Sequence, residues 1–234
     1  LTEWEGEPEI NADCEVKSRE VFRTYFEEAV KGNRTKNIVV AMHHPLYTNG
    51  PHGGQFTAKE HLFPLTALQS NLWIPLPLIG SLYPFYRSAV GAKQDAAHPD
   101  YRDLRDLMLS ILQKNGSFIL AAGHEHSLQY MERDDQAFIV SGSGSRRSAA
   151  RLANNAAFTY GATGFSQLDF YEDGSVWVQF WTPDESGAGE VVFRKQVKGA
   201  LEHLAAESEE TFALYESGQD SITLPLGEYD FSRN

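Results

Sequence analysis

Two short apolar runs, each preceded by a helical pattern and each ending at histidines, constrain this chain most. Residues 37–42 and 117–122 have the length of strands and do not alternate apolar with polar positions. That pattern is typical of strands that are covered on both faces. Apolar residues recur at helical spacing in 15–31 and again from Pro99 to Asn115-Gly116, which predicts a helix before each strand. Helix followed by strand, twice, indicates an α/β fold.

Later segments add strands of a different kind. Residues 136–140 form a third apolar run, and 165–171 and 176–181 flank Asp173-Gly174, the signal of an antiparallel hairpin. One more short strand is expected at 191–193. At 234 residues the chain is expected to form one large domain over 1–199, followed by an acidic helix and exit linker over 200–234.

Charge and cysteine content exclude several classes of protein. The formal net charge is −12 and no run of Lys and Arg occurs, so a nucleic-acid partner is not expected. A single cysteine, Cys14, excludes a disulfide framework and a cysteine-rich zinc module.

Residues 62–86 contain no formally charged side chain. Four prolines and three polar residues interrupt this segment, so we do not expect it to span a membrane as a helix. Two interpretations remain: a loop packed onto its own domain, and a lid or interfacial surface that forms one wall of a site for a bulky or lipid-like substrate.

Five histidines lie at or just beyond the carboxyl ends of the two apolar strands: His43, His44, His52, His124 and His126. Open α/β sheets bind ligands beyond strand carboxyl ends, and neutral imidazole is a common metal ligand. Residues at i and i+2 of an extended backbone point to one side, so His124 and His126 could bind one metal site together. The sequence therefore predicts a metal site at this end of the sheet.

The segments 39–47, 50–53 and 122–129 together resemble the last two motif blocks of calcineurin-like metallophosphoesterases, especially the purple acid phosphatase branch. The resemblance covers about residues 1–200 and implies half of an αββα sandwich with a mixed sheet. It also implies two divalent or transition metal ions of the Fe, Zn or Mn class in a complete enzyme. By position, His43 and His124 resemble ligands of one ion, His126 resembles a ligand of the other, and His52 resembles the catalytic histidine that contacts the phosphoryl group. The resemblance gives His44 no ligand role.

The earlier motif blocks of that family are absent. No Asp-x-His, Gly-Asp or Gly-Asn-His sequence occurs anywhere in the chain. We therefore expect the carboxyl-terminal half of such an enzyme, with at most one zinc-like ion and little activity alone. An exposed sheet edge is expected too, covered by the missing amino-terminal half or by self-association.

Two functions stay open at this point. The first is a metal-dependent phosphoester hydrolase present as a fragment, and the second is a non-catalytic binding or assembly module that retains the two histidine motifs. The resemblance favours an exported, periplasmic or cell-surface, location, and the acidic tail suggests membrane proximity in a longer parent. A turn at 141–147 is either a phosphate site, through Ser143, Ser145, Arg146 and Arg147, or simply flexible.

Overall fold

The computed structural model describes residues 12–200, and the expected acidic helix and linker beyond residue 200 lie outside that part. The chain divides into two compact units, Leu1–Leu168 with Val178–Lys195, and Asp169–Trp177 with Gln196–Asn234. The elements run in the order α2 (Arg19–Gly32), β1 (Ile38–Met42), η1 (Pro51–Gly53), α3 (Ala58–Leu62), η2 (Pro64–Ala67), η3 (Ile79–Ser81), α4 (Leu82–Ala89), α5 (Pro99–Leu112), η4 (Gln113–Asn115), β2 (Phe118–Ala122), β3 (Leu128–Arg133), β4 (Gln136–Ser141), β5 (Ala156–Tyr160), β6 (Phe165–Phe170), β7 (Val176–Pro183) and β8 (Gly189–Lys198).

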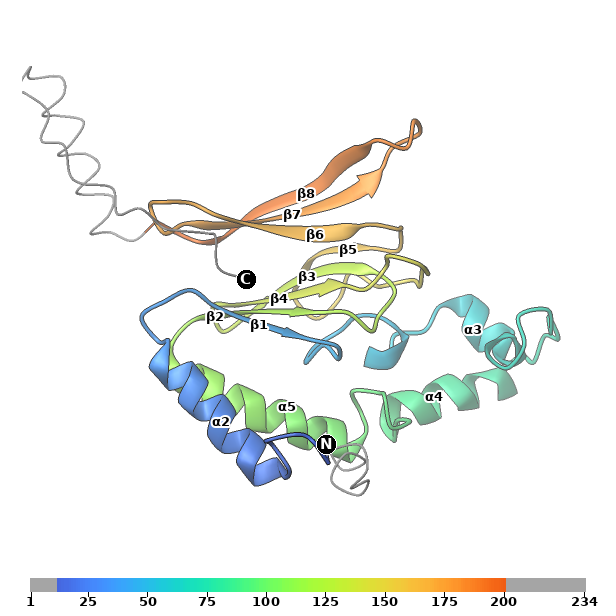
Figure 1. Ribbon diagram of the computed structural model, residues 1–234. Helices are drawn as coiled ribbons and strands as arrows, with labels where there is room; N and C mark the ends of the chain where they lie inside the picture. The colour runs from blue at the N-terminus through green and yellow to red at the C-terminus, as the bar shows by residue number, and fades with distance from the viewer. Residues whose placement is uncertain (1–11, 201–234) are drawn as a thin grey trace, which may run out of the picture. The chain divides into compact units, whose positions relative to one another are not determined.

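A five-stranded mixed sheet is the centre of the fold (Figure 1). Its order is β1-β2-β4-β3-β5, in which β1, β2 and β4 are parallel and β3 is antiparallel to both of its neighbours. Met42 is the partner of Ala122 in the register of β1 and β2, so both strands end at the same level. The α/β class and the mixed sheet expected from the sequence are confirmed.

Helices α2 and α5 lie beside each other and cover one face of this sheet (Figure 1). Ser18 caps α2 by accepting a hydrogen bond from the Val21 backbone, and Pro99 starts α5 at the position where its missing N–H costs nothing. Their apolar side chains form one buried cluster with Phe118 and Leu120 of β2. Ile119, which points to the other face of β2, is fully buried as well. Coverage on both faces is thus confirmed for β2. The same expectation for β1 is wrong, because β1 is the edge strand of the sheet and its residues alternate between partly buried and exposed.

A three-stranded sheet with the order β6-β7-β8 contributes to the second covering layer. The contacts are aromatic: the ring of Phe158 on β5 lies 5.0 Å from that of Phe180 and 4.7 Å from that of Phe193, centroid to centroid. Tyr130 on β3 also meets Phe193 at 5.7 Å. The hairpin expected around Asp173-Gly174 is present as β6 and β7.

Strand β1 is an edge of the five-stranded sheet, as expected for half of a larger sheet. Val39, its second residue, is 40% exposed, and a groove of about 420 Å³ runs along β1 and α2. The edge therefore offers unpaired backbone groups and apolar side chains to another strand.

Residues 62–86, together with their neighbours in 58–90, differ from the expectation, made for 62–86, of a loop packed onto its own domain. They form the short helices α3, η2, η3 and α4, and many of their large apolar side chains are exposed. Within the described residues, no helix is both long and apolar enough to cross a membrane. The sequence also gave no signal for β3 and β5, whose positions depend on pairing with β4 and with each other.

Candidate functional site

The histidine motifs meet because β1 and β2 are parallel and end together. The residue after β1 is His43 and the residue after β2 is Gly123, and the Gly123 backbone N–H donates to the carbonyl of His43 at 3.1 Å. The two loops that follow therefore leave the sheet side by side. This is the convergence that the position of the histidines predicts.

Three imidazoles form a compact group at this end of the sheet. Nδ1 of His124 lies 3.2 Å from Nε2 of His43, and each of His43, His44 and His124 offers one nitrogen such that all three lie within 4.8 Å of one another. The rings of His44 and His124 are 4.3 Å apart, centroid to centroid. His43 and His124 are thus brought together as expected, and His44, for which no ligand role was expected, joins them.

His126 is not part of this group among the described residues. His124 has a positive φ of 63°, so the backbone turns there and does not continue the extended path of β2. The i, i+2 spacing points two rings to one side only on an extended strand. The assignment of His126 to a second ion therefore stays a prediction.

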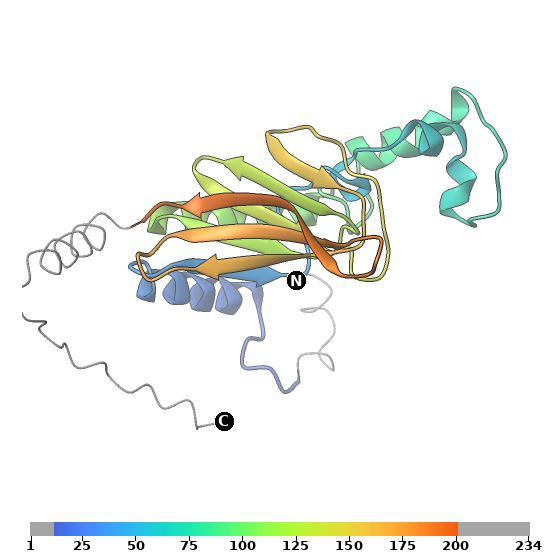
Figure 2. The same ribbon diagram turned by 90° about the horizontal axis from the view of Figure 1, so that it is seen from above.

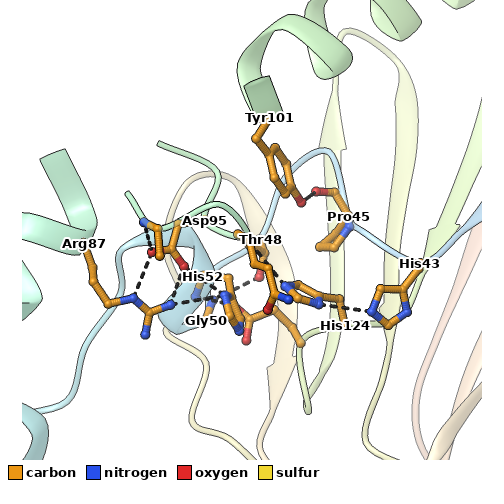
Figure 3. A network of polar contacts seen from close by, with 12 residues as sticks. His43, Pro45, Thr48, Gly50, His52, Arg87, Asp95, Tyr101 and His124 are labelled. Carbon is orange, nitrogen blue, oxygen red and sulfur yellow. Dashed lines mark hydrogen bonds and ion pairs between the residues drawn. The ribbon is translucent and has the colours of Figure 1, made fainter. Parts of the chain in front are cut away.

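His52 reaches the site from η1. Its ring lies 4.2 Å from the ring of His124, centroid to centroid, and its Nδ1 lies 2.9 Å from Oδ1 of Asp95. Asp95 also accepts hydrogen bonds from both Nε and Nη2 of Arg87, with Nε at 2.8 Å, and from the backbone N–H of Ala92 at 2.8 Å. Figure 3 shows this chain of contacts from Arg87 through Asp95 to His52.

The charge of Asp95 is fixed by these contacts. Burial alone would raise the pKa of its carboxyl, but hydrogen bonds from Arg87 and His52 outweigh burial and hold the pKa well below its ordinary value. An ionised carboxylate only accepts hydrogen bonds, so Nδ1 of His52 carries the proton between them. Nε2 is then the nitrogen of His52 that can take up or release a proton.

Glu125 lies beneath the site and is 1% exposed. Its Oε1 accepts a hydrogen bond of 2.7 Å from the backbone N–H of His52, and a Cβ added to Gly50 would overlap its carboxyl group. Burial raises the pKa of Glu125, against the lowering influence of His52. The close approach of Gly50 therefore lets one acidic side chain hold the start of η1 in place.

Burial also keeps the imidazoles of His124 and His44 neutral. It lowers the pKa of His124 to about 4, helped by the nearby His52, His44 and His43, and it lowers the pKa of His44 in the same way. Only neutral imidazole offers a lone pair to a metal ion, so at neutral pH these two side chains are ready to bind one.

The donor set fits one zinc-like ion. Two nitrogens bound to one tetrahedral zinc at about 2.0–2.1 Å stand roughly 3.3 Å apart, and the measured separation of 3.2 Å between His43 and His124 matches that spacing. No carboxylate belongs to the group within residues 12–200, because Asp95 is paired with Arg87 and Glu125 faces the backbone of His52. The described residues thus lack the bridging carboxylate that a second ion needs.

The serine-rich turn behaves differently from the histidine motifs. Ser143 is fully buried and its hydroxyl has no hydrogen-bond partner within the described structure, whereas Ser145, Arg146 and Arg147 are exposed. The phosphate-binding interpretation of this turn stays a prediction.

Sequence reasoning missed Arg87 and Asp95. They lie 35 and 43 residues after His52, in the segment between the two histidine motifs. A buried Asp eight residues after an Arg carries no signal of its own, and only the fold shows that both reach His52.

Comparisons with known proteins give a fold and no family. No protein-family model matches the sequence, and no curated protein matches it significantly. Among solved structures, the chain is similar to GAP50, the anchor in the inner membrane complex of Plasmodium, with a TM-score of 0.50 and 14% identity over 86% of this chain and 51% of that one. It is also similar to the purple acid phosphatase PPD1 from yellow lupin (Lupinus luteus) seeds, with a TM-score of 0.44 and 12% identity over 78% of this chain and 28% of that one.

These similarities concern architecture alone. The chain spans about half the length of GAP50, and the lower TM-score of the phosphatase supports no conclusion by itself. A mixed sheet with helices on one face is consistent with half of a metallophosphoesterase-type fold.

Proposed function

We propose that this chain carries the histidine half of a metal-dependent phosphoester hydrolase site, in which His43, His124 and His44 bind one divalent ion. The observation that supports it is the 3.2 Å approach of His43 and His124 from the ends of two neighbouring parallel strands, with the ring of His52 beside them. A bound divalent ion supplies Lewis acidity and a water of lowered pKa for attack on phosphorus.

His52 would act on the leaving group. Its Nδ1 proton is held by the ionised Asp95, so Nε2 can donate a proton to the departing oxygen and then accept one back. Arg87 balances the charge of Asp95, which keeps that carboxylate from drawing the His52 proton away. Asp95 and Arg87 are therefore positioning residues, and His52 is the catalytic residue.

The neutral donor set has a consequence for the substrate. Three uncharged imidazoles leave the full charge of a divalent ion uncompensated, so the site favours an anionic ligand such as a phosphomonoester or phosphodiester. The assignment of His126 to a second ion belongs to a complete site that also has carboxylate ligands.

Zinc titration followed by a phosphatase assay tests this proposal. We expect the chain to bind about one zinc ion, and His43→Ala and His124→Ala to weaken binding by at least tenfold, since each removes a ligand. His61→Ala is the matched control, because His61 hydrogen-bonds Ser81 outside the group and should leave affinity unchanged. Equal affinity in all four proteins would overturn the proposal.

The absence of a carboxylate ligand among residues 12–200 favours a second candidate, a non-catalytic binding or assembly module. A protein of similar fold is described as an anchor. Zinc binding that strengthens retention of a phosphoester, with no hydrolysis even when zinc is saturating, would select this function. Hydrolysis lost in His52→Ala with zinc affinity intact would select the hydrolase.

A further inference from the structure

The segment 62–86 is unusually apolar for a part of the chain with so many exposed side chains. It holds no formally charged side chain in 25 residues, where the chain average of 22% charged residues would give roughly five or six. Of the 19 large apolar side chains that are exposed in the described structure, 11 lie between residues 62 and 90. Such concentration marks a binding surface and is not the usual scatter of single exposed residues.

Five side chains form the most exposed part of this surface, which we call the apolar surface: Leu68, Leu78, Ile79, Leu82 and Phe85 are each between 65% and 90% exposed. They lie on a segment with defined structure. The Leu76 backbone N–H donates to the carbonyl of Leu62 at 2.8 Å, and Thr57 and Glu60 form a capping box that starts α3.

Close packing within the segment also indicates that it has a defined structure. Gly80 is buried, and a Cβ there would overlap the carbonyl of His61. The short helices α3, η3 and α4 contact one another (Figure 2). The exposed side chains are therefore held outward by a structure of their own.

We propose that the apolar surface docks on a zwitterionic lipid bilayer. An interface with another protein normally has charged residues in its rim, and residues 62–86 include none. Trp73, Tyr83 and Tyr86 are partly exposed within it, and such rings prefer the boundary between headgroups and acyl chains. The ammonium of Lys59 lies 4.2 Å from the ring centroid of Trp73, which places a cation at the margin of the apolar surface.

The mode of binding follows from helix length and charge. Helix α4 has eight residues and α3 has five, so the segment can lie in the interface but is too short to cross the bilayer as a helix. The net charge of −12 opposes approach to anionic lipid. Binding must therefore come from insertion of apolar side chains, without the help of electrostatic attraction.

Flotation of the full 234-residue chain with phosphatidylcholine vesicles tests the proposal. We expect binding that is unchanged between about 0.05 and 0.5 M salt, because apolar insertion is not screened. Leu82→Gln should weaken binding about tenfold, and Leu68→Gln with Leu82→Gln about a hundredfold, from the contribution of a buried Leu side chain. Leu152→Gln, at a residue 71% exposed, is the matched control and should bind as the parent does.

Three outcomes would overturn the proposal: no binding to vesicles, binding that salt abolishes, or equal loss in Leu82→Gln and Leu152→Gln. Sedimentation tests the alternative occupant, which is a second copy of the chain. A dimeric parent and a monomeric Leu82→Gln variant would show that a second copy covers the surface. If the double variant fails to fold by circular dichroism, Phe85→Gln replaces it with the same expected tenfold loss. The result is independent of zinc binding and hydrolysis, so it does not depend on the proposed function.

Discussion

Replacing Asp95 by Asn tests whether the site is held by charge. The carboxylate of Asp95 is 1% exposed and accepts hydrogen bonds from Arg87, His52 and the Ala92 backbone. Asn has the shape of Asp but no charge. Its side-chain amide nitrogen is itself a donor and would face a donor group of Arg87 or His52. Breaking a buried pair in this way costs about 3–5 kcal/mol. The Arg87 side chain is 15% exposed and that of His52 26%, so water offsets part of this cost and we expect about 2–4 kcal/mol.

Thermal and urea unfolding measure this loss. For a chain of this size it corresponds to a fall in Tm of about 4–16 °C. Arg87→Met is the second variant, because it leaves the Asp95 carboxylate buried without its guanidinium. The double variant should be less destabilised than the sum of the single ones by about 1–3 kcal/mol, since it leaves no unpaired charge. Strictly additive values would refute the argument that the two groups act as a pair.

The acid dependence of stability provides an independent check of the same pair. The pKa of Asp95 is lower in the folded chain than in the unfolded chain, so its contribution is present above the unfolded pKa of about 3.9. That contribution is lost as the pH falls through the folded pKa. Asp95→Asn should therefore flatten the loss of stability below about pH 4, and parallel acid profiles for the two proteins would contradict this expectation.

Two further changes test the geometry around the histidines. His44→Ala should weaken zinc binding at least tenfold and His126→Ala should not, because only His44 joins the compact group; calorimetric titration with the opposite ranking would favour the ligand set that the motif resemblance implies. Gly50→Ala should lower the free energy of unfolding by about 1–3 kcal/mol, because the new methyl overlaps the buried carboxyl of Glu125. Gly32→Ala, with nothing within 4 Å of the added methyl, is its control, and equal urea midpoints for the two would exclude the overlap.

Much of the fold could be predicted from local patterns. The helix over 15–31 begins at Arg19 after its Ser18 cap, the helix at Pro99 begins there, and the two apolar runs are β1 and β2. Strands β3 and β5 were missed, since their polar and apolar residues do not alternate clearly and their place depends on pairing with strands elsewhere in the chain. Short-range periodicity predicts where a helix or an apolar strand lies, but it does not predict which strands pair with each other.

The candidate site also has one part that local sequence patterns predict and another that depends on the tertiary structure. The sequence by itself determined that imidazoles stand at the carboxyl ends of two apolar strands, because strand length, apolar pattern and residue type are local properties. Only the tertiary structure decided that His44 joins His43 and His124 while His126 does not, since that depends on the register of β1 with β2 and on the positive φ at His124. It alone also brought Asp95 to His52, 43 residues away, because a side-chain contact over that distance follows from packing and not from spacing along the chain.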